Sequence, residues 1–350
     1  MKEMCRKTIT FPNKRGIFIP EECIGGHAGA FEYRGHGNPI FLPRIEGLGH
    51  LNWLAELMAL VAEDGRSYYE CIGVATMTAP INDTLSHASL PVIFEDLIEC
   101  RQYAWGRNEA RLQVLTDSFY RGAEAYGVAI TGGETAAQRY QVQAYPPIED
   151  APLFSGNAIG IVNPPSRYIS GKALQEGDVI LGARSTGMHI NGASAVIRKA
   201  LEKPEILLDP LPNGMTFGEA LLVDPACYLD LVEALLNAGV KIHAMLAGSG
   251  GGVSKVAYDK RNFLYAIEEW PELLPVFQHM LTIGIPLHDC LKTFNWGIGW
   301  FVFLPEREAD KAVGVSKSTP TPLTYLGYVT EGMRSVDFRP ERIRLDPPEA

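Results

Sequence analysis

The sequence contains few of the features that mark a secreted, membrane-bound or nucleic-acid-binding protein. Its six cysteines lie far apart, and no two of them form a Cys-x-x-Cys pair. That spacing argues against a zinc site and against a disulfide framework. We recognise no signal peptide and no long apolar run. The formal net charge is -10 and no cluster of lysine and arginine offsets it, which argues against nucleic acid. We therefore expect a cytoplasmic protein that binds neither nucleic acid nor a membrane.

The composition is that of a globular chain with material for a sizeable core. Hydrophobic residues make up 46% of its 350 positions, and this length predicts two domains or one large one. A strand pattern ends at Val162, and Pro164 and Pro165 interrupt the chain soon after it. We place the domain boundary there, which gives domains at residues 1–163 and 164–350.

One stretch organises the second half. An apolar strand pattern at residues 178–182 leads into a small-residue loop at 183–192, and an amphipathic helix pattern follows from residue 193. Asn191 is a candidate N-cap for that helix. Unpaired N–H groups at a helix start receive phosphate or carboxylate groups. The loop therefore predicts an anion site, with simple helix capping as the alternative.

Two acidic positions stand out in the first half. Glu46 follows a strand pattern at residues 39–42 and precedes a helical pattern at 51–61; it is a candidate metal or substrate ligand, or else a solvated acid. Asn82 and Asp83 lie together on a helical pattern at residues 74–85. Because Mg²⁺ takes only one or two protein carboxylates, this pair can hold a divalent cation. A solvent-facing aspartate is the alternative.

Glycine-rich loops follow two further strand patterns. A short apolar strand at residues 128–130 opens into Gly132, Gly133, Glu134 and Thr135; the glycines clear space, and the two side chains can face whatever fills it. A second strand pattern, at residues 240–245, leads into a glycine run at 248–252. We also expect a helix capped at residue 224 and a loosely packed tail after residue 336.

In chain order these motifs resemble the phosphoribosylformylglycinamidine cyclo-ligase family, also called aminoimidazole ribonucleotide synthetase. The resemblance covers nearly the whole chain. Its specific elements are Gly-Gly-Glu-Thr-Ala at residues 132–136 and Thr-Phe-Asn-Trp-Gly-Ile-Gly at 293–299. The other matching motifs are Gly-Gly-His-Ala-Gly-Ala at 25–30, Glu-Gly-Leu-Gly at 46–49, Asn-Asp at 82–83, Gly-Asp-Val-Ile at 177–180, Ser-Thr-Gly-Met-His-Ile-Asn-Gly at 185–192, Phe-Gly-Glu-Ala-Leu-Leu at 217–222 and Gly-Gly-Gly at 250–252.

The resemblance implies an α+β fold of two domains, with mixed sheets that carry helices on one side. It implies a homodimer in which the N-terminal domains pair, and it implies ATP and Mg²⁺ as cofactors. The activity it implies belongs to purine synthesis. ATP phosphorylates the formyl oxygen of formylglycinamidine ribonucleotide, a substrate nitrogen closes the imidazole ring, and ADP and phosphate leave. The expected partner is therefore a phosphorylated purine-pathway intermediate.

Carried over position by position, the resemblance also implies a set of site residues. The catalytic group would be Asp83, Glu134 and His189, and the metal ligands would be Asp83 and Glu46. The residues expected to bind ATP or substrate are Glu46, Gly47, Gly49, Asn82, Gly132, Gly133, Thr135, Ser185, Gly187, Asn191, Gly250 and Gly251.

The chain departs from the family pattern at two charged positions. Leu51 stands where the family has a lysine, and Ala247 stands where it has a histidine. Arg44 or His50 could replace the lost charge. The alternative is a non-catalytic or repurposed paralogue that binds a nucleotide or phosphorylated metabolite. Selenophosphate synthetase, the hydrogenase-maturation carbamoyl dehydratase and thiamine-monophosphate kinase fit the motifs less well.

Overall fold

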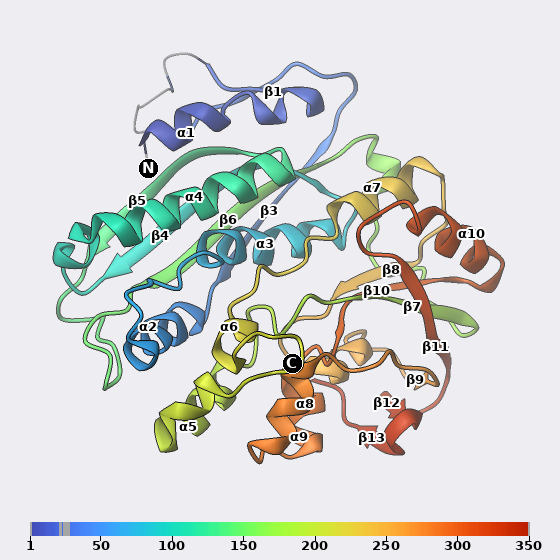
Figure 1. The fold of residues 1–350 in the computed structure, drawn as a ribbon. Coiled ribbons are helices and arrows are strands. Elements are labelled where there is room, and N and C mark those ends of the chain that lie inside the picture. Colours follow the sequence, from blue (N-terminus) through green and yellow to red (C-terminus); the bar gives the residue numbers. More distant parts are fainter. Residues whose placement is uncertain (1, 21–22, 24–28, 349–350) are drawn as a thin grey trace.

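The computed structural model describes residues 2–20, 23 and 29–348, and each half of the chain contributes one large sheet, with a separate two-stranded sheet of β1 and β2 near the N-terminus (Figure 1). Residues 25–28 of the Gly-Gly-His-Ala-Gly-Ala motif lie outside the described residues. In the described part, no helix combines the length and the apolar character needed to cross a membrane. Both large sheets are mixed, so the predicted α+β class is confirmed.

The N-terminal sheet has four strands in the order β3-β6-β4-β5. Only β4 and β5 run parallel. Helices α3 and α4 cover one face, where Phe94 packs on Phe119 with ring centroids 6.1 Å apart. The elements of this half are α1 (Lys2–Thr8), η1 (Phe11–Arg15), β1 (Ile17–Phe18), β2 (Glu32–Tyr33), β3 (Ile40–Gly47), α2 (Leu51–Ala62), α3 (Ile72–Leu85), β4 (Leu90–Cys100), η3 (Tyr103–Arg107), α4 (Glu109–Tyr126), β5 (Ala129–Ala137) and β6 (Leu153–Val162).

The other face of this sheet is only partly covered. Ile17 of β1 packs there in a small core with residues of β4, β5 and β6. Pleating places alternate residues of β3 on this face, and among them Phe41 and Ile45 are exposed, as is Leu153 of β6. An apolar strip therefore remains open on the N-terminal half.

The C-terminal sheet has seven strands in the order β13-β12-β9-β11-β7-β10-β8. Its strand β10 is apolar and buried at every position, as expected for a central strand with both faces covered. The elements are β7 (Asp178–Arg184), α5 (Ala193–Glu202), α6 (Phe217–Leu221), α7 (Leu229–Asn237), β8 (Ala244–Ala247), η6 (Gly252–Ala257), β9 (Phe263–Ile267), α8 (Pro275–Thr282), α9 (Leu287–Thr293), β10 (Ile298–Pro305), α10 (Glu306–Ser316), β11 (Leu323–Glu331), β12 (Ser335–Phe338) and β13 (Ile343–Leu345), with short η4 (Pro165–Arg167), η5 (Pro204–Leu208) and η7 (Arg339–Glu341).

The two halves share one continuous hydrophobic core. A buried arginine adds a polar link between them. The guanidinium of Arg15 donates to three backbone carbonyls of the N-terminal half, and its Nη2 lies 3.0 Å from Glu233 Oε1 on α7. The halves therefore pack against each other over a shared interior.

Three local predictions were wrong. The cap of α5 is Gly192, at φ 95, and not Asn191; a left-handed backbone there suits glycine. Helix α7 begins at Leu229 rather than after Asp224. The tail after residue 336 forms strands β12 and β13, because burial of Leu345 ties it to the sheet.

Candidate functional site

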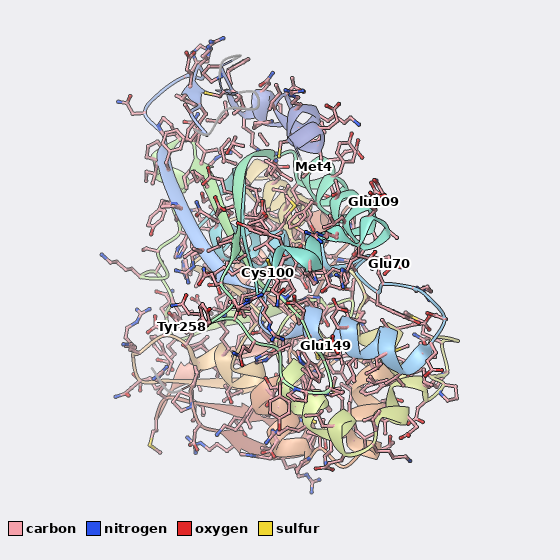
Figure 2. The ribbon with its side chains drawn as sticks, turned by 90° about the vertical axis from the view of Figure 1, so that its left-hand side faces the viewer. Met4, Glu70, Cys100, Glu109, Glu149 and Tyr258 are labelled. Carbon is pink, nitrogen blue, oxygen red and sulfur yellow. The ribbon has the colours of Figure 1, made fainter. Side chains whose placement is uncertain are left out.

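A cavity of about 820 Å³ lies between the two halves. The N-terminal half lines it with residues from β3 and α3, and the C-terminal half with β8, η6 and the loop that holds residues 189–191. Tyr258, 63% exposed, belongs to the lining, and Figure 2 shows it at the surface, at the level where the two halves meet. The cavity is therefore open to solvent at this point.

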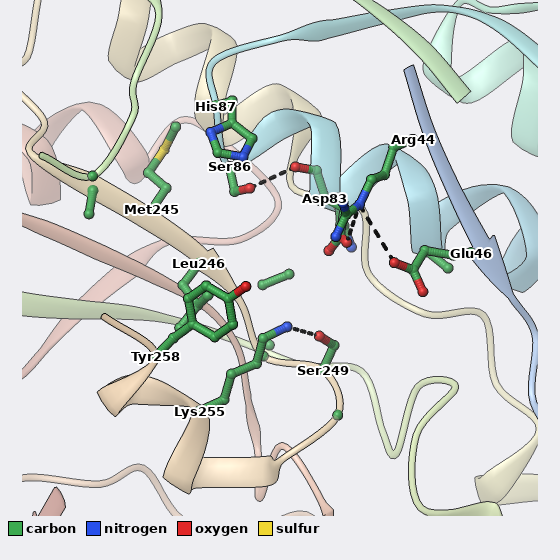
Figure 3. A pocket seen from close by; sticks show the side chains of 18 of the residues that line it. Arg44, Glu46, Asp83, Ser86, His87, Met245, Leu246, Ser249, Lys255 and Tyr258 are labelled. Carbon is green, nitrogen blue, oxygen red and sulfur yellow. Dashed lines mark hydrogen bonds and ion pairs between the residues drawn. The ribbon is translucent and has the colours of Figure 1, made fainter. Parts of the chain in front are cut away.

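Two carboxylates and an arginine form the N-terminal wall of the cavity. Arg44 and Glu46 stand two residues apart on β3, so strand pleating puts both on the face towards α3, which carries Asp83. The Nε atom of Arg44 lies 3.0 Å from Asp83 Oδ2 and 3.6 Å from Glu46 Oε1. Figure 3 shows the guanidinium between the two acids. The predicted pair of Glu46 and Asp83 is thus brought together.

The carboxyl group of Glu46 has a raised pKa. Burial raises the pKa of its carboxyl to about 6, and a hydrogen bond with Asp83 and that group's charge add to the rise. The positive charges of Arg44 and Lys255 oppose it. Near neutral pH the wall can therefore carry two negative charges, which suits a hard divalent cation. Among the described residues no larger group of His, Cys, Asp and Glu gathers that could hold a metal ion.

The opposite wall carries a lysine that the motif comparison did not single out. Lys255 lies on η6, after the glycine run, and its Nζ donates to Ser249 Oγ. Burial lowers the pKa of the Lys255 ammonium, while Asp83 and Glu46 act against that shift. Figure 3 shows this pair facing the acidic wall. A lysine three residues after a glycine run was the available sequence signal.

His189 is buried in the lining as a neutral imidazole. Its Nε2 accepts hydrogen bonds from the backbone N–H groups of Thr186, at 3.3 Å, and Ala226, at 3.2 Å. Burial lowers its pKa to about 4. Because Nε2 accepts, the ring proton resides on Nδ1. At neutral pH His189 can thus orient a ligand through an N–H donor, but its uncharged ring does not act as a general acid.

Two side chains predicted to bind ligand form hydrogen bonds within the protein. The Asn82 amide donates from Nδ2 to Ala226 O and accepts at Oδ1 from the Tyr228 N–H, so it joins α3 to the C-terminal half. The Ser185 hydroxyl donates to Asn295 Oδ1. These polar atoms are engaged within the protein; Asn82 nevertheless lines the cavity, whereas Ser185 does not, and the ligand-binding role of each side chain stays a prediction.

Buried hydrogen bonds from Asn295 hold the loop that contains Ser185. Asn295 Nδ2 donates to the carbonyl groups of Gly187 and Met188. A Cβ at Gly187 would stand 2.9 Å from Val223 Cγ2, so packing alone explains the glycine. Of the residues predicted in this loop, only His189 and Asn191 reach the cavity lining.

Glu134 does not join the other acids within one chain. The sheet register aligns Glu134 of β5 with Leu97 of β4, whereas Glu46 shares its row with Gly156, Asp96 and Gly133. Adjacent rows point to opposite faces, and β5 is three strand spacings from β3, about 14 Å. The predicted catalytic grouping of Asp83 with Glu134 is therefore not formed, and Gly132, Gly133 and Thr135 also lie outside the cavity lining.

Of the four remaining glycines predicted to bind ligand, two line the cavity and two lie beside it. Gly47 and Gly250 line the cavity, and a Cβ at Gly250 would stand 3.3 Å from the Asn191 amide oxygen. Gly49 and Gly251 flank it: a Cβ on the first would approach Ile190 O at 3.7 Å, and one on the second would approach Pro348 at 3.6 Å. The C-terminal tail therefore reaches the glycine run.

The residues at the two departures from the family pattern are both buried, one in the core and one in the wall of the cavity. Leu51 is wholly buried in α2, and Ala247 is buried in β8 at the cavity wall. His50 does not face the acids; its Nδ1 lies 3.0 Å from Ser194 Oγ. Of the two proposed substitutes for the lost lysine, only Arg44 therefore contacts the carboxylates.

Comparisons with known proteins show which sequences and folds this chain is similar to. Residues 175–338 match the family model described as AIR synthase related protein, C-terminal domain. The phosphoribosylformylglycinamidine cyclo-ligase of Rippkaea orientalis is 29% identical over 89% of this chain and 88% of its own. That of Clostridium novyi is 27% identical over 96% of this chain and 93% of its own.

Solved structures share the fold. Hydrogenase Maturation Protein HypE superposes with a TM-score of 0.65 at 17% identity and covers 97% of each chain. Thiamine-monophosphate kinase from Stenotrophomonas maltophilia gives 0.64 at 17% identity, with 95% of this chain and 94% of that one covered. A structure of HypE in complex with ATP gives 0.61 at 17% identity over 88% and 83% of the two chains.

Proposed function

We propose that this chain, whose residues 175–338 match the AIR synthase-related family model, is an ATP-dependent cyclo-ligase. Its substrate is formylglycinamidine ribonucleotide, and its products are aminoimidazole ribonucleotide, ADP and phosphate. The observation that carries the proposal is the cavity in which the acids of β3 and α3 face the lysine and glycine run of the other half. The names of the relatives and the ATP bound by HypE support it.

The chain's own residues bind and orient the reactants. Glu46 and Asp83 would hold Mg²⁺, which supplies neutralising charge for the nucleotide phosphates. Arg44 then releases one or both acids and turns to a phosphate oxygen, which a guanidinium can bind through two N–H groups. His189 directs its Nδ1–H at a substrate oxygen. The two walls hold ATP and substrate in line for transfer, and this positioning lowers the barrier.

A turnover assay tests this function. The purified protein, with ATP, Mg²⁺ and formylglycinamidine ribonucleotide, should release ADP and phosphate in step with formation of the imidazole product. Asp83→Asn should lower kcat/KM by more than the about 10–100-fold lost when a group that supports a metal ligand is removed, because Asp83 would be a ligand itself. Asp310→Asn, on the exposed side of α10, is the matched control and should retain full activity. No substrate-dependent ADP release by the wild type would refute ring closure.

A second candidate is a repurposed member of the family that binds a nucleotide or phosphorylated metabolite without closing a ring. The observation in its favour is the ion pairing of Arg44 with both acids, which offsets part of the negative charge of the expected metal site. MgATP should raise the melting temperature under either proposal, because any ligand of the folded state stabilises it. Only the cyclo-ligase would consume ATP in proportion to the purine intermediate.

We also propose a homodimer through the N-terminal halves. The exposed apolar strip of Phe41, Ile45 and Leu153 supports it, since Ile45 is 67% exposed on the open face of the sheet. Light scattering coupled to size exclusion should give twice the chain's mass of 38.4 kDa. Ile45→Asp should shift the protein towards the monomer, because it places a charge on an apolar contact.

A further inference from the structure

One cation in the cavity has no acidic partner of its own. Lys255 donates to the neutral hydroxyl of Ser249, and no carboxylate lies within ion-pairing distance of it in the described part of the chain. Its side chain is largely removed from water, which lowers the pKa of the ammonium. A partly buried, unpaired charge is costly to maintain. The position is therefore one where an anionic ligand would supply what the protein lacks.

The two nearby carboxylates are paired with Arg44 and form no ion pair with Lys255. Its guanidinium contacts Asp83 at 3.0 Å and Glu46 at 3.6 Å, so both carboxylates are paired on their own wall. Lys255 is attached to the other half of the chain, on η6, and its ammonium faces those acids across the cavity (Figure 3). On one wall the carboxylates are thus paired with an arginine, whereas Lys255 on the other wall forms no ion pair with a carboxylate in the described part of the chain.

The backbone next to Lys255 also presents donors. In the described structure, the N–H groups of Gly250 and Gly251 donate to no backbone carbonyl, whereas their neighbours Gly248 and Gly252 donate to Gly299 O and Ser249 O. Gly251 has φ 94, a left-handed conformation that glycine adopts readily. Backbone N–H groups without a carbonyl partner can receive the oxygens of a phosphate.

We propose that Lys255, the Ser249 hydroxyl and the amides of Gly250 and Gly251 form a phosphoryl-binding subsite, in which Lys255 is the charged contact. This inference rests on the proposed function, because it assigns one end of the ligand of that same cavity. The ligand's phosphoryl group lies against the C-terminal wall, and its reacting end extends towards Asp83 and Glu46. The phosphoryl group belongs either to the ribonucleotide substrate or to ATP, and the chemistry at the subsite is the same.

Calorimetric binding measurements with two probes test the subsite. Ribose 5-phosphate represents the substrate's phosphate monoester, and MgATP represents the nucleotide. Lys255→Met keeps the length of the side chain and removes its charge, and it should weaken binding of one probe by about 10–100-fold, the loss expected for one charge-assisted hydrogen bond. Lys255→Arg should restore most of that affinity. Lys317→Met, at the exposed end of α10, is the matched control and should bind both probes normally.

The two probes separate the sources of the phosphoryl group. A loss confined to ribose 5-phosphate places the substrate's phosphate at the subsite, and a loss confined to MgATP places the nucleotide there. Ser249→Ala should weaken the same probe by a smaller factor, and it provides a second variant should Lys255→Met fail to fold. Unchanged affinity for both probes in Lys255→Met, or no binding of either by the wild type, would overturn the subsite.

The outcome is distinguishable from failure of the proposed function. If the wild type binds a probe through Lys255 but does not convert formylglycinamidine ribonucleotide, the subsite stands and the cyclo-ligase activity falls. If turnover is normal and Lys255→Met leaves KM for both substrates unchanged, the activity stands and the subsite falls. A structural role for Lys255 would lower the melting temperature without the rescue by arginine.

Discussion

Replacing Asn82 by alanine should destabilise the protein rather than remove a ligand contact. The side chain is 7% exposed and bridges two backbone groups of the other half, with 3.0 Å from Nδ2 to Ala226 O and 3.2 Å from the Tyr228 N to Oδ1. Truncation leaves a buried C=O and a buried N–H unpaired. Each unsatisfied group costs about 1–3 kcal/mol, so the two together give an expected loss of about 2–6 kcal/mol.

Urea unfolding followed by circular dichroism measures this loss. Asn82→Asp keeps the acceptor for the Tyr228 N–H but sets an oxygen against Ala226 O, so it should also destabilise the protein. Asn237→Ala, at the exposed end of α7, is the matched control and should change the free energy of unfolding by no more than about 0.5 kcal/mol. An Asn82→Ala protein that unfolds like the wild type but binds MgATP or substrate less tightly would refute the role of Asn82 in joining the two halves.

Two further predictions concern charged groups. If Glu46 must be ionised to hold Mg²⁺, affinity for the metal should fall about tenfold per pH unit as the pH drops below its pKa of about 6. Calorimetry over pH 5–8 measures this, and Glu46→Gln should bind weakly at every pH; a wild-type affinity constant across the range would contradict it. Glu56→Gln should cost about 3–5 kcal/mol of unfolding free energy in urea, because it leaves the half-buried Arg111 guanidinium, now 2.8 Å from Glu56, without its counter-charge. A loss below 1 kcal/mol would show that Arg111 finds another partner.

Local patterns were sufficient for most of the fold. The apolar pattern at residues 178–182 predicted a strand, and β7 occupies the interior of the larger sheet. Helix starts were less predictable. Asn191 and Asp224 are favourable caps by residue type, but the chain begins α5 after a left-handed Gly192 and begins α7 four residues past Pro225. Packing against the rest of the protein decided those starts.

The position of Glu134 shows why the site could be predicted only in part. The register between β4 and β5 shifts at residues 130–132, where one extra residue, Thr131, enters β5. Without that bulge Glu134 would align with Ile98 and point to the face that carries Glu46. Because a shift of one residue moves a side chain to the other face of a sheet, no motif could reveal this outcome.

The order of motifs along the sequence predicted the resemblance to the cyclo-ligase family and, through it, the pairing of Asp83 with Glu46, and the strand and helix periods predicted the α+β class. Only the tertiary structure decided which polar side chains are left for a ligand. Asn82 and Ser185 are engaged in holding backbone, whereas Lys255 faces the cavity with a neutral hydroxyl as its partner. That difference depends on which groups from distant parts of the chain come within hydrogen-bonding distance, and spacing along a sequence carries no such information.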